Sequence, residues 1–250
     1  MINFNKYYPD EFKKLRNAGR ISSKCLDYIQ DKIKPGITTQ NIDEMCVKFL
    51  HKHKAYSAPL FYRGFPKSIC TSVNHVVCHG IPSDKTLNEG DIVNVDVTSF
   101  VDGYHGDTSR TYYVGKVSIK AKNLVETTKE ALDRSIKILK PGVHVGNIGN
   151  EIQTYVEKKG YSVVRDFCGH GVGREFHEEP NILHYGKGGT GPKLQEGMVF
   201  TIEPMINAGK HETKVLNDGW TAVTKDKSLS AQFEHTVGIT NNGYEIFTLS

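Results

Sequence analysis

Apolar side chains recur every three or four positions in four separate stretches of the chain, and this spacing predicts amphipathic helices. The first two stretches cover residues 10–33 and 42–50, with Thr38 and Thr39 as candidate N-caps of the second helix. The other two stretches run from about 119 to 139 and from 148 to 156. The chain is therefore expected to contain two pairs of helices, each followed by residues with strand character.

The two helix pairs repeat one another at an offset of 106 residues. The matches in register are Leu26-Asp27 with Leu132-Asp133, Lys34-Pro35-Gly36 with Lys140-Pro141-Gly142, Asn41-Ile42 with Asn147-Ile148, and Phe49 with Tyr155. Four matches in one register indicate an internal duplication. We therefore predict a single α+β domain over residues 1–250, with pseudosymmetric halves at about 10–115 and 119–250 and a cleft between them.

A β-hairpin is expected around Asp102-Gly103, a two-residue turn signal with β-branched and apolar residues on both sides. With these two residues as the loop, Asp96 faces Ser109, and Asp107 lies two positions away on the same face. Asp96 and Asp107 then become diagonal neighbours about 7–8 Å apart at Cα. A single aspartate in a strand usually faces water, but two anions directed at one spot repel each other unless a cation lies between them. The hairpin alone leaves both explanations open.

Three further candidates for a metal site lie in the second half of the chain. Residues 197–204 and 230–239 are expected to form strands, which Glu203 and Glu234 interrupt as single charged residues, and His170 is expected in a glycine-flanked loop. Taken singly, the glutamates are typical of the water-facing half of a strand, and the histidine of a hydrogen-bonding residue. Four carboxylates and one neutral imidazole buried together would instead need divalent ions to balance their charge. Such a donor set suits a pair of Mn, Fe, Co or Zn ions and metal-assisted hydrolysis.

Composition and charge exclude several classes of protein and indicate no further function. The 250 residues are 38% hydrophobic and 24% charged, values typical of a globular protein, and the net charge of +4 is spread along the chain. No basic run indicates nucleic acid, no apolar run is long enough for a bilayer, and the amino terminus has no export signal. The five cysteines include no Cys-x-x-Cys pair, which favours free thiols in a reducing compartment. We expect a cytoplasmic protein that binds neither nucleic acid nor membrane.

Separated motifs follow one another in a fixed order along the chain: Cys78-His-Gly-Ile-Pro82, Asp96, Asp102-Gly-Tyr-His-Gly-Asp-Thr108, Gly169-His-Gly-Val-Gly173, Thr201-Ile-Glu-Pro204 and Gln232-Phe-Glu-His235. With these motifs the chain resembles the type I, bacterial-type methionine aminopeptidases. The resemblance covers residues 10 to 249 and implies the pita-bread fold that prolidase and aminopeptidase P share. It also implies removal of the N-terminal methionine from nascent polypeptides with a small second residue. We also expect a monomer, because the sequence shows no N-terminal extension with zinc or proline-rich motifs, and transient association with the ribosome is left open.

The resemblance assigns the metal ligands residue by residue. Asp96 would bind one of two divalent ions, His170 and Glu203 would bind the other, and Asp107 and Glu234 would bridge both. The ion at Asp96 would also receive the free α-amine of the substrate, which explains why only a chain terminus is cut.

The resemblance also assigns catalytic roles. A hydroxide bridging the two metal ions would attack the first peptide carbonyl, with Glu203 as proton acceptor. His177 would hydrogen-bond the carbonyl oxygen as it becomes an oxyanion, and His79 would contact the scissile amide nitrogen. Apart from the resemblance, both histidines read as ordinary polar loop residues. The remaining histidines, including His105, His184 and His235, keep that interpretation.

The pocket for the methionine side chain should be apolar and lined by aromatic and sulfur groups. The matching positions are Tyr62, Phe65, Cys70, Phe176 and Trp220, with Trp220 expected at the rim. The sequence departs from the common bacterial pattern at three positions, with Pro59, Arg63 and Phe65 in place of Cys, His and Tyr. The family pattern also implies a monovalent cation bound by backbone carbonyls of Asn74, Val76 and Ser230.

Two other classes of function compete with this interpretation. One is a proline-directed peptidase of the same fold, which usually carries a large additional N-terminal domain. A type II methionine aminopeptidase would need an inserted helical segment between His177 and Glu203, where none is present. The other class is a non-catalytic pita-bread protein that binds partners, and it predicts lost metal ligands. Release of methionine from a Met-Ala-Ser peptide would separate these possibilities.

Overall fold

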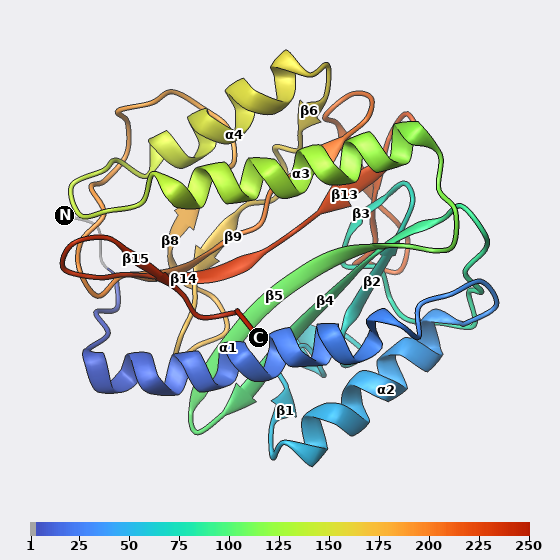
Figure 1. Ribbon diagram of the computed structural model, residues 1–250, viewed down its shortest axis with the longest axis horizontal. Coiled ribbons are helices and arrows are strands. Elements are labelled where there is room, and N and C mark those ends of the chain that lie inside the picture. Colours follow the sequence, from blue (N-terminus) through green and yellow to red (C-terminus); the bar gives the residue numbers. More distant parts are fainter. Residues whose placement is uncertain (1–3) are drawn as a thin grey trace.

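The computed structural model describes residues 4–250. The prediction that the amino terminus carries no export signal concerns residues that lie partly outside this range. Its four long helices form two pairs (Figure 1). They are α1 (Pro9–Gln30), α2 (Thr39–Lys52), α3 (Ile119–Lys137) and α4 (Gly146–Lys158). The Thr38 hydroxyl accepts a hydrogen bond from the Asn41 backbone N–H and caps α2, as expected. The helix predicted to reach residue 33 ends at Gln30.

The break between the helices of each pair has the same construction in both halves. Gly36 and Gly142 have φ values of 93° and 87°, in the left-handed region that favours glycine. Each glycine N–H donates to a leucine carbonyl from the strand-bearing part of its own half, Gly36 to Leu87 at 2.8 Å and Gly142 to Leu194 at 2.9 Å. The repeat read from the sequence therefore corresponds to a repeated three-dimensional unit.

The strands form two larger and two smaller antiparallel sheets. The first larger sheet contains β1 (Tyr56–Ser57), β2 (Cys70–Val73), β4 (Ile92–Val101) and β5 (Tyr104–Tyr113), and the second contains β7 (Gly169–Gly171), β8 (Glu178–Ile182), β9 (Val199–Ile202), β14 (His235–Ile239) and β15 (Tyr244–Ile246). The smaller sheets are β6 (Ser162–Val163), β10 (Met205–Asn207) and β13 (Ser230–Gln232), and β3 (Val76–Cys78), β11 (Thr213–Val215) and β12 (Ala222–Thr224). A short 3₁₀ turn, η1, covers Tyr62–Gly64.

The predicted hairpin is confirmed in register. Val101 pairs with Tyr104 across the Asp102-Gly103 turn, and Asp96 pairs with Ser109. Asp107 lies opposite Thr98, so the two aspartates are diagonal neighbours on one face of the β4–β5 ribbon. The local turn chemistry was thus sufficient to fix which residues face each other.

Neither of the two strands predicted at 197–204 and 230–239 is continuous over its whole length. β9 ends at Ile202, directly before Glu203, and β10 begins at Met205, beyond the predicted strand, whereas 230–239 divides into β13 and β14 on either side of Phe233 and Glu234. β9 and β14 pair in the five-stranded sheet, whereas β10 and β13 pair in a separate three-stranded sheet. The apolar runs are continuous because both sheets are buried, and the break arises where the chain passes from one sheet to the other.

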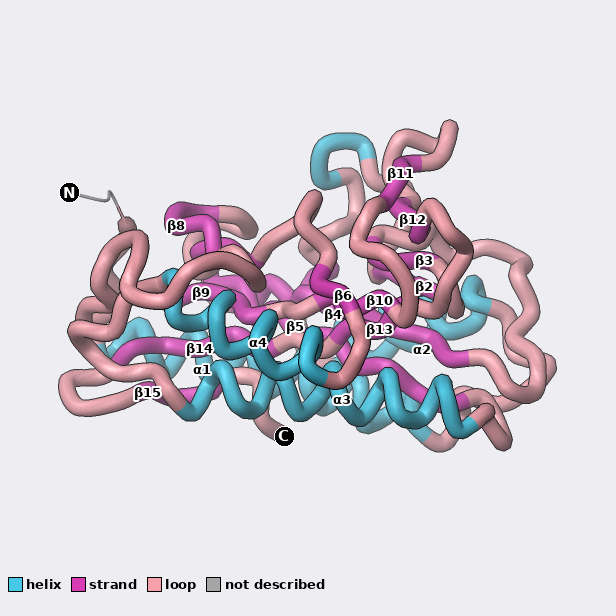
Figure 2. The backbone as a smooth tube through the Cα atoms, turned by 90° about the horizontal axis from the view of Figure 1, so that it is seen from above, coloured by secondary structure: helices cyan, strands magenta, loops and turns pink. Residues whose placement is uncertain are grey.

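The helices and strands form two layers. The four helices lie on one side of the strands, and β8, β11 and β12 project on the other side (Figure 2). One core cluster joins α1 and α2 to β4 and β5, and a second joins α3 and α4 to the strands of the second half. Together with the helix–sheet layers, the paired halves confirm the predicted α+β pita-bread arrangement. Among residues 4–250, no helix combines the length and apolar character needed to cross a membrane.

Candidate metal centre and active site

A cavity of about 620 Å³ is lined by residues of β4, β5 and β7 and by Glu203 and Glu234, which follow β9 and β13. Its walls include the five residues predicted as metal ligands, the two histidines with predicted catalytic roles and the five residues predicted for the side-chain pocket. These residues come from both halves of the chain. The structure thus brings all the candidate positions to one place, although they span residues 62 to 234.

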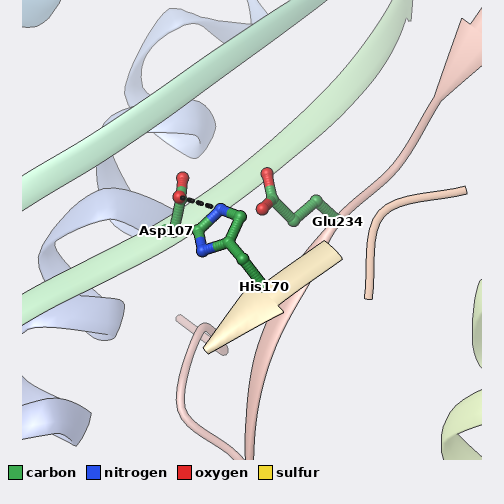
Figure 3. Close-up of side chains that lie close together, drawn as sticks. All are labelled: Asp107, His170 and Glu234. Carbon is green, nitrogen blue, oxygen red and sulfur yellow. Dashed lines mark ion pairs between the residues drawn. The ribbon is translucent and has the colours of Figure 1, made fainter. Parts of the chain in front are cut away.

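Asp107, His170 and Glu234 converge most closely. Each offers one ligand atom, and these atoms all lie within 4.8 Å of one another (Figure 3). The Nε2 atom of His170 lies 3.7 Å from Oδ2 of Asp107 and 3.6 Å from Oε1 of Glu203. The ring therefore faces carboxylates contributed by both halves of the molecule.

Thr236 fixes the hairpin against the second half. Its hydroxyl accepts a hydrogen bond from the Asp107 backbone N–H at 3.1 Å and donates to the Asp107 carbonyl at 2.7 Å. The Thr108 hydroxyl donates to the Glu234 carbonyl at 2.6 Å. These buried threonines set the relative position of two carboxylates that lie far apart in the sequence.

Burial raises the pKa values of Asp96, Glu203 and Glu234 well above their usual range, and repulsion from Asp107 raises them further. Burial raises the pKa of Asp107 as well, against a hydrogen bond from Thr98 that lowers it. In the absence of a cation, the folded protein thus disfavours four ionised carboxylates at this position. An arrangement of this kind is costly unless positive charge is supplied.

His170 is held as a neutral ring. Burial lowers its pKa to about 4, and its Nδ1 atom lies 2.9 Å from the Gly171 carbonyl. A hydrogen bond from Nδ1–H to that carbonyl leaves the Nε2 lone pair directed at Asp107 and Glu203. This is the tautomer that a metal-binding histidine requires.

The donor set fits divalent metal ions. The Oδ1 atom of Asp96 is buried and has no hydrogen-bond partner within residues 4–250, so this carboxylate lacks the partner that a buried anion needs. Four carboxylates with one imidazole suit first-row divalent ions better than they suit a metal that prefers thiolate ligands. Cations at this position would satisfy both the unpaired oxygen and the accumulated negative charge.

His170 lies in strand β7, not in the glycine-flanked loop expected from the sequence. A Cβ atom on Gly169 would come within 2.4 Å of the Thr201 carbonyl oxygen, and one on Gly171 within 2.3 Å of the Glu179 carbonyl oxygen. The glycines thus allow β7 to pack closely between β8 and β9. These glycines are needed for close packing between strands. In the sequence, they look the same as glycines in a flexible loop.

Aromatic rings surround the remaining part of the cavity. Tyr62 stacks on His177 with ring centroids 5.1 Å apart, and Phe176 packs against both rings. Phe65 is buried and meets the edge of Trp220 at 5.2 Å, while Trp220 is only half-buried, as expected of a rim residue. The apolar wall and the carboxylate cluster therefore face one shared space.

Comparison with known proteins places these features in a family. Residues 13–241 match the model of metallopeptidase family M24. The chain belongs to metallopeptidase family M24. The methionine aminopeptidase of Rickettsia prowazekii is 58% identical over 241 residues, which cover 96% of this chain and 93% of the relative. That of Escherichia coli K12 is 51% identical over 243 residues, covering 96% and 92%.

Solved structures of M24 proteins have the same fold. The crystal structure of methionine aminopeptidase from Rickettsia prowazekii superposes with a TM-score of 0.98 at 56% identity, covering 99% of this chain and 100% of that one. Prolidase from Pyrococcus furiosus superposes with a TM-score of 0.77 at 25% identity, covering 98% of this chain and 65% of that one. The predicted resemblance to type I methionine aminopeptidases is confirmed.

His184 is a residue of this M24 site that sequence reasoning missed. It was interpreted as an ordinary polar loop residue, but it is 1% exposed, and its Nε2 atom accepts a hydrogen bond of 3.1 Å from the Glu203 backbone N–H. Burial lowers its pKa to about 3, so the ring is neutral and can accept this bond. No local signal marks this contact, because the partner lies 19 residues away on another element.

Proposed function

We propose that this chain is a metal-dependent aminopeptidase that removes the N-terminal methionine from nascent polypeptides and prefers a small second residue. The main support is the convergence of Asp96, Asp107, His170, Glu203 and Glu234 on one cavity that also has an aromatic wall. Identities of 51–58% to methionine aminopeptidases over nearly the whole chain support the substrate class. The intact donor set disfavours a non-catalytic binding protein.

Two divalent ions, drawn from Mn, Fe, Co and Zn, form part of this proposal. Asp96 would hold one ion, His170 and Glu203 the other, and Asp107 and Glu234 would bind both. When bound, such ions supply Lewis-acid polarisation of a carbonyl and lower the pKa of a water molecule.

The side chains around the ions would carry the rest of the reaction. Glu203 would accept the proton of the attacking water, and its hydrogen bonds from Thr201 at 2.8 Å and Gln232 at 3.2 Å support a fixed orientation. His177 would donate a hydrogen bond to the developing oxyanion, and His79 would contact the scissile amide nitrogen. His79 lies edge-on to Trp220, with ring centroids 6.1 Å apart, and lines the same cavity as the carboxylates.

The methionine side chain would occupy the space bounded by Tyr62, Phe65, Cys70, Phe176 and Trp220. Thioethers make favourable contacts with aromatic rings, and burial of the terminal methyl group adds a hydrophobic contribution. Burial keeps Cys70 uncharged by raising its pKa, so the pocket presents a neutral thiol. A charged first side chain would lose its hydration against these apolar walls.

Several broader properties belong to the same proposal. They are a single domain over residues 1–250, a monomeric state, a cytoplasmic location and transient contact with the ribosome. A monovalent cation at the carbonyls of Asn74, Val76 and Ser230 is a further part of it. The Ser230 N–H donates to the Asn74 carbonyl at 2.8 Å, which supports the proximity of two of these residues.

Release of methionine from Met-Ala-Ser, measured with and without added Mn²⁺, tests the proposal. We expect metal-dependent release, faster than from Met-Leu-Ser, and no release by the Asp107→Ala or Glu203→Ala variants. No cleavage of any Met-starting peptide under metal-replete conditions would refute the proposed activity. Preferential cleavage before proline would instead support a proline-directed peptidase.

A further inference from the structure

The segment before α1 contacts the loop that carries His177. Tyr7 is 2% exposed, and its backbone N–H donates to the Gly197 carbonyl at 2.9 Å. Its hydroxyl donates to Oε1 of Glu178 at 2.6 Å, across 171 residues of sequence. A residue close to the amino terminus therefore hydrogen-bonds to Glu178, which lines the cavity of the proposed active site.

The Tyr7 hydroxyl organises the loop between β7 and β8. It accepts a hydrogen bond from the Arg174 backbone N–H at 2.9 Å while donating to Glu178. The same Oε1 atom of Glu178 accepts the Glu175 backbone N–H at 2.9 Å. A Cβ atom on Gly173 would lie 2.1 Å from the Tyr7 hydroxyl oxygen, so glycine at this position makes room for the contact.

The orientation of His177 depends on this loop. Within residues 4–250 the imidazole of His177 has no hydrogen-bond partner, and its neighbours are the rings of Tyr62, His170 and Phe176. Stacking restrains the orientation of the imidazole plane but does not fix the position of the ring within that plane. The backbone position of residue 177 is set by the pairing of Glu178 with Gly171 on one side and by the bonds at Arg174 and Glu175 on the other.

We propose that Tyr7 and Glu178 are positioning residues that hold His177 at the carbonyl of the substrate. This inference rests on the proposed function, because it gives the Tyr7–Glu178 contact a role only if His177 acts on a substrate. A hydrogen bond to a carboxylate is among the stronger ones in proteins, and the Tyr7–Glu178 bond is partly shielded from water. Loss of the hydroxyl would leave Glu178 with one donor fewer and the Arg174 N–H without its acceptor.

A double-mutant cycle between Tyr7→Phe and His177→Ala tests the coupling. Phenylalanine keeps the ring, which packs under the Arg174 guanidinium at 4.7 Å and against Tyr104 at 6.4 Å. With Met-Ala-Ser as substrate, we expect Tyr7→Phe to lower kcat/KM about tenfold, chiefly through kcat. His177 would donate to the transition state, so its misplacement should raise the activation barrier more than it weakens substrate binding. In the His177→Ala background the same substitution should change kcat/KM less than about twofold.

Two other tyrosines provide matched controls. Tyr112→Phe also removes a buried hydroxyl, which donates to the Leu26 carbonyl at 2.8 Å, but on the helix side of the hairpin. Tyr8→Phe changes the neighbouring exposed ring. Both variants should retain the parent kcat/KM, and all variants should bind Mn²⁺ as the parent does in titration calorimetry.

Amide hydrogen exchange gives a readout that does not depend on activity. The peptide containing Arg174 and Glu175 should exchange about tenfold faster in Tyr7→Phe and at the parent rate in Tyr112→Phe. Parent-like exchange in Tyr7→Phe, or an equal loss of kcat/KM in both backgrounds, would overturn the inference. Failure of the parent protein to cleave Met-Ala-Ser would refute the proposed function instead, while the exchange result would still report on the loop.

Discussion

Replacement of His184 is expected to weaken metal binding although His184 is not a proposed ligand. Its Nε2 atom is the only acceptor within residues 4–250 for the backbone N–H of Glu203, and both groups are buried. A leucine side chain would fill much of the same space without an acceptor. A glutamine side chain would place Oε1 near the position of Nε2 and preserve the hydrogen bond.

The magnitude follows from the burial of the Glu203 N–H. A buried donor left unsatisfied costs about 1–3 kcal/mol, and His184→Leu should lower the free energy of unfolding by about this amount. Groups that orient a metal ligand typically contribute about 10–100-fold to metal affinity, so Mn²⁺ should bind more weakly by a factor in this range. For His184→Gln we expect a change of less than about threefold, because the acceptor is retained.

Titration calorimetry with Mn²⁺ and urea unfolding of the metal-free protein measure the two effects separately. Equal Mn²⁺ affinities for the leucine and glutamine variants would refute the role given to the acceptor. If both variants lost stability equally while both kept the parent affinity, His184 would contribute packing alone.

Three further expectations concern metal removal, strand packing and the second catalytic histidine. Burial raises the pKa of Asp107 to about 7, so the chelated protein binds a proton there that the unfolded chain has released. The free energy of unfolding of the parent minus that of Asp107→Asn should therefore increase as the pH falls from about 8 to about 6, because the buried neutral histidines, which oppose this slope, are present in both proteins. A difference that stays constant or decreases in urea titrations with EDTA would contradict this. Gly169→Ala places a Cβ atom 2.4 Å from the Thr201 carbonyl oxygen and should destabilise the fold by about 1–3 kcal/mol, whereas Gly142→Ala, strained by its φ of 87° but free of contacts, tests strain alone in the same assay. His79→Ala should slow methionine release with the Mn²⁺ content unchanged, and normal turnover would remove its role.

The parts of this fold that follow local rules were predictable from the sequence. The Asp102-Gly103 turn fixed the hairpin register, which in turn placed Asp96 and Asp107 on one face. Thr38 marked the start of α2 because a hydroxyl at that position satisfies a free N–H. In each case the deciding interaction joins residues close together in the sequence.

The parts that were missed depend on contacts between distant elements. The breaks at Glu203 and Glu234 occur where strands leave one sheet for another, and an apolar run reads the same in either sheet. Tyr7 acquires its role only when the loop at Glu178 folds against it, 171 residues later. Neither feature has a periodicity or a turn signal of its own.

The duplication explains how the site combines its ligands. Glu89-Gly90 recurs 107 positions later as Glu196-Gly197, with φ values of 91° and 88° at the two glycines, and the same spacing relates Asp96 to Glu203. Each half thus supplies a carboxylate at an equivalent position of the repeat, Asp96 in β4 and Glu203 directly after β9, and Asp107 and Glu234 add one more from each half. His170 breaks this symmetry, because β7 belongs to the second half alone and places its ring against Asp107 of the first. Neither half holds the full donor set by itself, so the negative charge that favours a cation arises only when the two copies pack together.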